Sequence, residues 1–187
     1  MSLIPNPLHP AVVHLPVAIA VLVPIVAISA LVFIRRGARA RTAWGVTVAL
    51  LGALFISGWV SLKTGEQQEE RVEDVVAERS IHVHEEAAEL FLVTTAAVLA
   101  ISLAGFAGGR VGKAGRWVAT LGTVGILGAG WNVGHTGGML VYRDGAASAY
   151  ATDGQVRADG QVRSEGGDVE QPRRAKESER RDSDDRR

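Results

Sequence analysis

The chain alternates between long apolar stretches and short charged segments, a pattern that predicts helices crossing a membrane. Apolar residues dominate four stretches, at about 11–34, 43–62, 87–108 and 117–142. Each can span a hydrocarbon core of about 30 Å, which takes about 20 helical residues. Because the runs are continuous rather than strictly alternating, they favour helices over barrel strands. We therefore predict an all-α fold, a four-transmembrane-helix bundle formed by residues 1–142.

The first stretch could be mistaken for a signal peptide. However, no Lys or Arg precedes it, and its apolar run is longer than that of a signal peptide. Arg35 and Arg36 follow it directly. We therefore interpret it as a span that stays in the chain.

The charges of the connecting segments predict the orientation. The segments after the first and third stretches are basic, whereas the segment after the second is mainly acidic. The basic residues are Arg35, Arg36, Arg39, Arg41, Arg110, Lys113 and Arg116. Short loops rich in Lys and Arg stay in the cytoplasm. We predict a multi-pass protein of the cell (inner) membrane, with both termini and the acidic loop outside the cytoplasm.

Aromatic residues and the acidic loop would mark the two membrane faces. Trp44 and Trp117 would lie at the inner interface, with Trp59 and Trp131 nearer the outer one. The outer loop, 64–80, carries Val72, Val75 and Val76 among acidic residues. This spacing suggests a short amphipathic surface helix, and a solvated charged linker is the alternative.

The tail, residues 143–187, differs from the rest of the chain because it has almost no large apolar side chains. The sequence DGQVR at 153–157 is repeated at 159–163. Such a segment cannot bury enough apolar surface to offset its ordering entropy. We predict a disordered charged tail, either simply solvated or binding a partner.

Overall composition excludes several classes of function. The 20 Lys and Arg balance the 20 Asp and Glu, so no net field indicates nucleic acid as a partner. The absence of cysteine excludes disulfides, thiolate metal sites and covalent haem attachment through CxxCH. Neither a P-loop nor a dinucleotide-binding GxGxxG is present. No nucleophile–base arrangement is visible, so an enzyme is not indicated.

All the histidines fall at the predicted outer ends of the spans. They are His9, His14, His82, His84 and His135. Imidazole is the commonest metal ligand and the usual axial ligand of haem iron. Facing helices of a bundle can direct such ligands to one interior site. Histidines on three helices at one depth, His14, His84 and His135, therefore form the candidate cofactor site.

Neighbouring residues refine this choice. His82 and His84 are two helical steps apart, about 200°, so at most one of them faces inward. We favour His84, because Ala88, Phe91 and Thr95 share its face. His9 precedes Pro10 and would lie at or before the helix cap, so His9 and His82 are the weaker metal candidates. Glu89 lies within a span, where an ionisable group is a functional hypothesis by default.

The fourth stretch is dense in glycine, including the series Gly130, Gly134 and Gly138. Small residues at this spacing allow helix backbones to approach closely. The alternative, which the glycine spacing alone favours less, is that the glycines leave room for a flat macrocycle. Asn132 and Trp131, one turn before His135, could hydrogen-bond a ligand or another helix.

Three motifs in this pattern resemble a known family. They are NPLHPAVVHLP at 6–16, His84 at the head of the third span, and GHTGGMLVY at 134–142. Together they are similar to domain-of-unknown-function family 2231, predicted four-helix bacterial membrane proteins, over residues 5–145. The resemblance implies His9, His14, His84 and His135 as family positions. Some members resemble fusions to cytochrome-type domains, which implies an association with redox proteins; this chain has no such domain.

Three functions follow as hypotheses. The first is a b-type cytochrome, with haem b near the outer face held by two of His14, His84 and His135, relaying electrons to a redox partner protein. The second is a non-haem metal site of histidines with Glu89. The third is a structural or scaffolding protein whose polar residues only pack helices. The lipid bilayer is the one partner common to all three, and a homo-oligomer remains open.

Overall fold

The computed structural model describes residues 9–149, and these residues form helices and connecting loops with no strand. The elements are α1 (His9–Val12), α2 (His14–Arg35), α3 (Ala40–Glu66), α4 (Glu69–Glu73), α5 (Glu78–Leu103), the 3-10 helix η1 (Ala104–Phe106) and α6 (Gly109–Tyr142). The predicted all-α class is therefore confirmed for this part of the chain. Most of the tail, 150–187, lies outside the described residues, so the prediction of disorder there stays a prediction.

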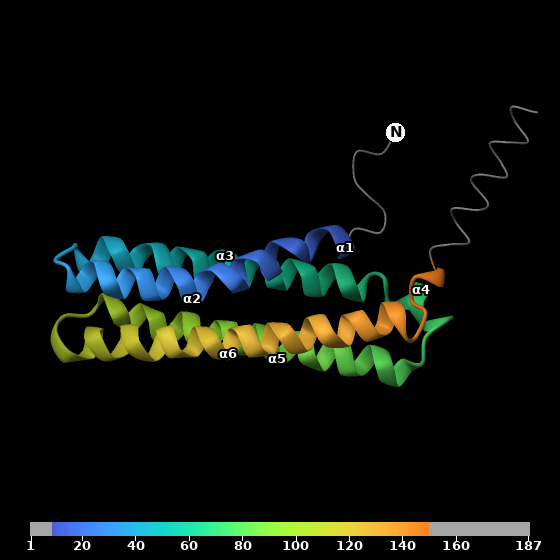
Figure 1. The fold of residues 1–187 in the computed structure, drawn as a ribbon. Helices are drawn as coiled ribbons and strands as arrows, with labels where there is room; N and C mark the ends of the chain where they lie inside the picture. Colours follow the sequence, from blue (N-terminus) through green and yellow to red (C-terminus); the bar gives the residue numbers. More distant parts are fainter. Residues whose placement is uncertain (1–8, 150–187) are drawn as a thin grey trace, which may run out of the picture. The chain divides into compact units, whose positions relative to one another are not determined.

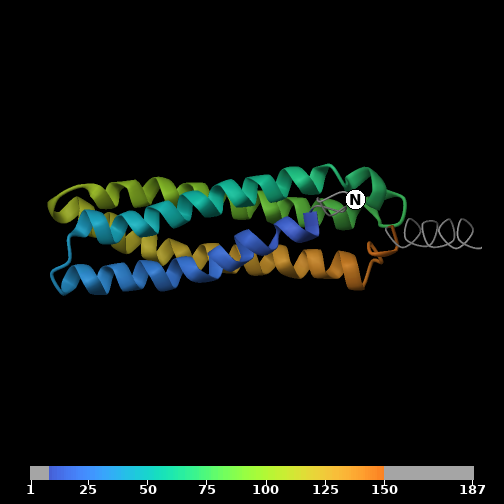
Figure 2. The ribbon, with the colours of Figure 1, turned by 90° about the horizontal axis from the view of Figure 1, so that it is seen from above.

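Four long helices, α2, α3, α5 and α6, lie side by side and run alternately in opposite directions (Figures 1 and 2). Each packs against its neighbour in the chain, and α2 also packs against α6, which closes the bundle. The basic segments after α2 and after α5 are thus at one end, called the basic end below. His9, the end of α3, the start of α5 and the end of α6 are at the other, called the histidine end.

The outer surface is apolar, unlike that of a water-soluble bundle, and the interior combines an apolar core with buried hydroxyls. Large apolar side chains point outward along the helices; Val93 is 65% exposed and Leu121 is 67% exposed. The interior holds small hydroxyl residues, namely Thr47, Ser57, Ser61, Thr64, Thr95, Ser102, Thr120 and Thr123. Most of these hydroxyls donate to a carbonyl three or four residues earlier in their own helix. A continuous apolar surface of this size indicates a lipid surrounding.

Three helical segments are long and apolar enough to cross a membrane: His9–Arg35, Ala40–Glu66 and Glu78–Phe106. They correspond to the first three predicted stretches. The first two segments extend past their apolar stretches at both ends, because charged side chains do not interrupt backbone hydrogen bonding. The third begins nine residues before its predicted start and ends at Phe106, two residues before the predicted end. Helix α6 has 34 residues and packs along α5 and α2. It is not among the three, since glycine and polar residues lower its mean hydropathy.

The regular hydrogen bonding of the first span is interrupted at Val13, between α1 and α2, although the backbone of Val13 keeps a right-handed helical conformation. Pro16 explains it, because proline has no N–H to donate to the carbonyl of Val12 and its ring crowds that carbonyl. The break leaves α1 as a four-residue helix that packs mainly against α3. Pro24, in contrast, lies inside α2 without ending it.

At the basic end, Trp44 differs from expectation. It is fully buried, and its indole Nε1 donates to the carbonyl of Ser102 at 2.8 Å. A Cβ placed on Gly105 would overlap that Nε1, so only glycine fits beside the ring. Trp44 therefore joins α3 to α5 and η1 inside the bundle, and is not part of an interfacial aromatic belt. Trp117, Trp59 and Trp131 are exposed.

A small apolar cluster closes the histidine end. Val76 and Ile81 are buried against Ala146, with Val72 and Leu140 beside them. In the acidic loop, α4 has only five residues, and Val75 remains exposed. The loop thus contains both predicted features. One is the short helix α4, and the other is a charged linker whose Val76 is buried in this cluster. The first compact unit of the chain extends to Ala146, four residues beyond the predicted boundary.

Candidate functional site

His9 lies half-buried at the histidine end, between α1 and α3. Its Nδ1 is 2.9 Å from the carbonyl oxygen of Ser61 and 3.3 Å from the Thr64 hydroxyl. Its ring also packs against Gly65, where a Cβ would meet the imidazole Cε1 at 3.3 Å. Contacts with Ser61, Thr64 and Gly65 in the last turns of α3 therefore hold this ring against the bundle.

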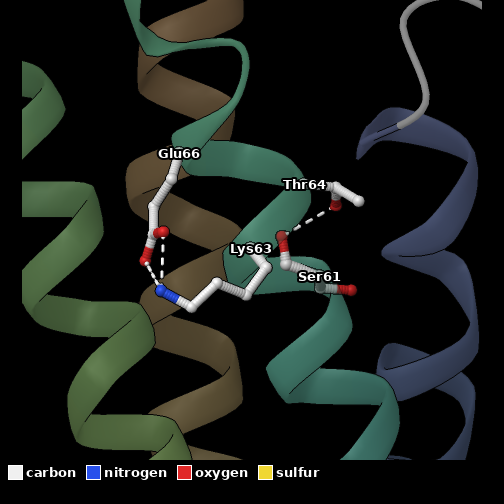
Figure 3. A network of polar contacts seen from close by, with 4 residues as sticks. All are labelled: Ser61, Lys63, Thr64 and Glu66. Atoms are coloured by element: carbon white, nitrogen blue, oxygen red, sulfur yellow. Dashed lines mark hydrogen bonds and ion pairs between the residues drawn. The ribbon is translucent and has the colours of Figure 1, made fainter.

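The hydroxyls beside His9 come from the last turns of α3 (Figure 3). Thr64 donates to the carbonyl of Ser61 at 2.9 Å, and the Ser61 side chain points from α3 towards α1. The Ser61 hydroxyl is buried and has no hydrogen-bond partner among the described residues. Further out, Lys63 pairs with Glu66 at 2.7 Å on an exposed face, away from His9. The interior of this end thus has one hydroxyl still able to bond.

His84 lies half-buried at the same end, on α5, and its ring faces α6. Its Nδ1 is 3.0 Å from the Thr136 hydroxyl. A Cβ on Gly137 would lie 3.0 Å from the Cε1 of His84, closer than a side chain normally allows. The ring of His84 therefore occupies space that any larger residue at 137 would fill.

His9 and His84 both lie at the histidine end, His9 at the start of α1 and His84 in the first turns of α5. His9 comes from the first span and packs against Gly65 of α3. His84 comes from the third span and packs against Gly137 of α6. Two turns deeper, the Phe91 ring packs between Gly58 of α3 and Gly130 of α6. Phe91 forms an apolar floor below the two histidines, so the polar site is confined to the end of the bundle.

The other two predicted haem ligands lie elsewhere. His14 is exposed on the outer face of α2, and His135 is exposed on the outer face of α6. Of the expected set His14, His84 and His135, only His84 faces the interior. The reason is helical geometry: His14 and His135 are outside the buried faces formed by Val23 and Ala27 on α2 and by Ile126 on α6.

The acidic candidate Glu89 and the weaker candidate His82 are also exposed. His82 lies 3.6 Å from Glu78 and 3.3 Å from Glu85, all on α5. It lines an open hollow together with Glu78, Arg79, Val83 and Glu86, and His84 is not part of this hollow. Glu89 is exposed and is directed away from the interior histidines. As the face assignment predicted, His84 rather than His82 is directed inward.

Within residues 9–149, no group of three or more His, Asp or Glu side chains is placed to hold a metal ion. The interior histidines form a pair instead. Sequence reasoning gave His9 less weight because Pro10 seemed to put it before the helix. The useful signal was its spacing: His9, Pro16, Val23 and Ala30 are seven residues apart and share one helix face.

Comparisons with family models, with curated proteins and with solved structures found no match to this chain. The resemblance to family 2231 therefore stays a prediction, and the interpretation of the site depends on its own geometry.

Proposed function

We propose that this chain is a multi-pass membrane protein that binds a b-type haem between helices at its histidine end and serves in electron transfer. The observation that carries the proposal is the pair of half-buried imidazoles, His9 and His84, which come from separate spans at one end of the bundle. When bound, haem would supply one-electron redox chemistry.

The number of interior ligands supports haem over a non-haem metal. Structural and catalytic zinc sites take three or four protein ligands. Haem iron needs only axial ligands from the protein, because the macrocycle supplies the others. Two interior histidines without a nearby carboxylate suit the second requirement. A non-haem site with Glu89 would need that side chain to turn from the outer face of α5.

The surroundings of the pair also fit such a group. Gly65 and Gly137 leave the rings unobstructed where a Cβ would touch them, and the Ser61 hydroxyl can bond a polar substituent. Helix α1 contributes one of the two imidazoles and is only four residues long. Because Pro16 has no N–H to donate to the carbonyl of Val12, the link between α1 and α2 is held by fewer backbone hydrogen bonds than the rest of the span.

The proposal includes a fourth span and an orientation. Helix α6 is uncharged over 117–142 and as long as its neighbours, so it completes the bundle in the bilayer. The basic segments at one end place that end in the cytoplasm by the positive-inside rule. The histidine end and both termini are then extracytoplasmic, in the cell (inner) membrane. A redox protein on that side is the expected partner.

The first prediction concerns the purified protein. We expect detergent-purified wild type to contain about one haem per chain, with the visible spectrum of a bis-histidine haem, since two imidazoles are available. Absorption spectroscopy and elemental analysis measure this directly. Haemin titrated into the protein controls for incomplete loading during expression.

A colourless protein that contains stoichiometric zinc or copper would support the non-haem alternative. A protein that contains no metal and does not take up haemin would leave the structural role, and the proposed function would be wrong.

A further inference from the structure

The hydrogen bonds around the two interior histidines determine which ring nitrogen is free. In a neutral imidazole one nitrogen carries the proton and the other has the lone pair. The partner of His9 Nδ1 at 2.9 Å is the backbone carbonyl of Ser61, which can only accept. His9 Nδ1 must therefore donate, and the lone pair of this ring is on Nε2.

The same reasoning applies to His84 through a hydroxyl. Thr136 has one hydroxyl proton, and the carbonyls of Asn132 and Val133 lie 3.0 and 3.1 Å from its oxygen. With its proton directed to its own helix, Thr136 accepts from Nδ1 of His84. His84 therefore also carries its lone pair on Nε2.

We propose that His9 and His84 bind the cofactor through their Nε2 atoms, and that Thr136 is a positioning residue that fixes the tautomer and orientation of His84. Metal-bound histidine characteristically donates its other N–H to a carbonyl or similar acceptor, which is the arrangement around both rings. This inference rests on the proposed function and goes further, because it replaces His14 and His135 with His9 and assigns the ligating atoms.

The ligand test uses pairs of histidines on the same span. We expect His9→Ala and His84→Ala to lose the bis-histidine spectrum after haemin titration. His14→Ala and His82→Ala, which change exposed residues, are the matched controls and should bind as wild type does. Added imidazole should restore the spectrum of His84→Ala, a rescue that a merely structural role would not produce.

The positioning test uses Thr136. Removal of an outer partner of a ligating histidine typically weakens metal affinity about 10–100-fold. We expect Thr136→Val, which has the same shape without the hydroxyl, to weaken haemin binding within this range. Thr136→Ser keeps the acceptor and should bind as wild type does. Equal affinity of Thr136→Val and wild type would overturn the positioning role.

A second measurement does not need the cofactor. Nitrogen-15 NMR of histidine-labelled protein without haem distinguishes the two tautomers, and the signals lost in His9→Ala and His84→Ala assign the rings. We expect both rings to be protonated at Nδ1. Protonation at Nε2 in either ring would overturn the assignment of that ring's ligating atom.

The two proposals can fail separately. If wild type binds haem but its spectrum depends on His14 or His135 instead of His9, the ligand assignment is wrong and the proposed function stands. If wild type binds no haem, the proposed function fails, whatever the NMR shows.

Discussion

At the scale of single residues, helical phase decides which histidine enters the bundle. His9 and His14 are five residues apart, which turns them about 140° from each other around a helix axis. Only His9 shares the face of Val23 and Ala30, so it is half-buried while His14 is exposed. Alignment with the buried face of the helix was therefore a better predictor of which histidine is inside than distance from the helix cap.

Two adjacent glycines in α6 provide a residue-scale prediction. A Cβ at Gly137 would lie 3.0 Å from the His84 ring, whereas a Cβ at Gly138 would contact nothing within 4 Å. We expect Gly137→Ala to displace the ring and lower haemin affinity, by about tenfold if its effect matches loss of an outer partner. Gly138→Ala should leave binding unchanged. Equal binding by the two variants would contradict the packing of His84 against Gly137.

The site could be predicted from the sequence only in part. The pattern correctly placed His84 inward, because Ala88, Phe91 and Thr95 extend its face along α5. The partner at His9 depends on a helix break and on contacts with the distant residues Ser61 and Thr64. Such contacts between spans do not follow from the periodicity of either span alone.

At the scale of elements, small residues determine how closely the helices pack. The glycines of α6 that touch α5 are Gly122, Gly130 and Gly137, which contact Val98, Phe91 and His84 respectively. They are seven or eight residues apart, two helical turns. The series Gly130, Gly134 and Gly138 drifts off this face, because four residues exceed one turn of 3.6. The contact with α5 thus follows a two-turn spacing.

The contact of Trp44 with η1 gives an element-scale prediction. A Cβ at Gly105 would overlap the indole and displace it from the carbonyl of Ser102. We expect Gly105→Ala to destabilise the bundle by about 3 kcal/mol, the upper end of the usual cost of overpacking. Thermal or denaturant unfolding in detergent measures this. Gly52→Ala, where nothing lies within 4 Å, is the control; an equal effect of the two would mean that Trp44 does not fill this space.

At the scale of the whole molecule, the chain has two chemically different ends. The segments 35–41 and 110–116, which are basic and carry no acidic residue, lie at one end, and the interior histidines lie at the other. The number of long helices and their alternating directions could be predicted from apolar run length alone. The buried role of Trp44 could not, since it depends on a neighbouring glycine 61 positions later in the chain.

The orientation is a prediction at this scale. We expect a reporter active only in the cytoplasm to give signal when fused after Arg39, and none when fused after Asp144, since the basic loops stay inside. A reporter active only outside should give the opposite pattern. Cytoplasmic signal from the fusion after Asp144 would mean that the histidine end faces inward or that α6 does not span.

The location of His9 and His84 at one end has a consequence for energy conversion. In the proposed orientation, an electron reaching the site from an extracytoplasmic donor would cross little of the transmembrane voltage. An electron arriving from the cytoplasmic side would cross most of it, at about 2.3 kcal/mol for each 100 mV. The first route would be almost independent of membrane potential, whereas the second would make the protein electrogenic.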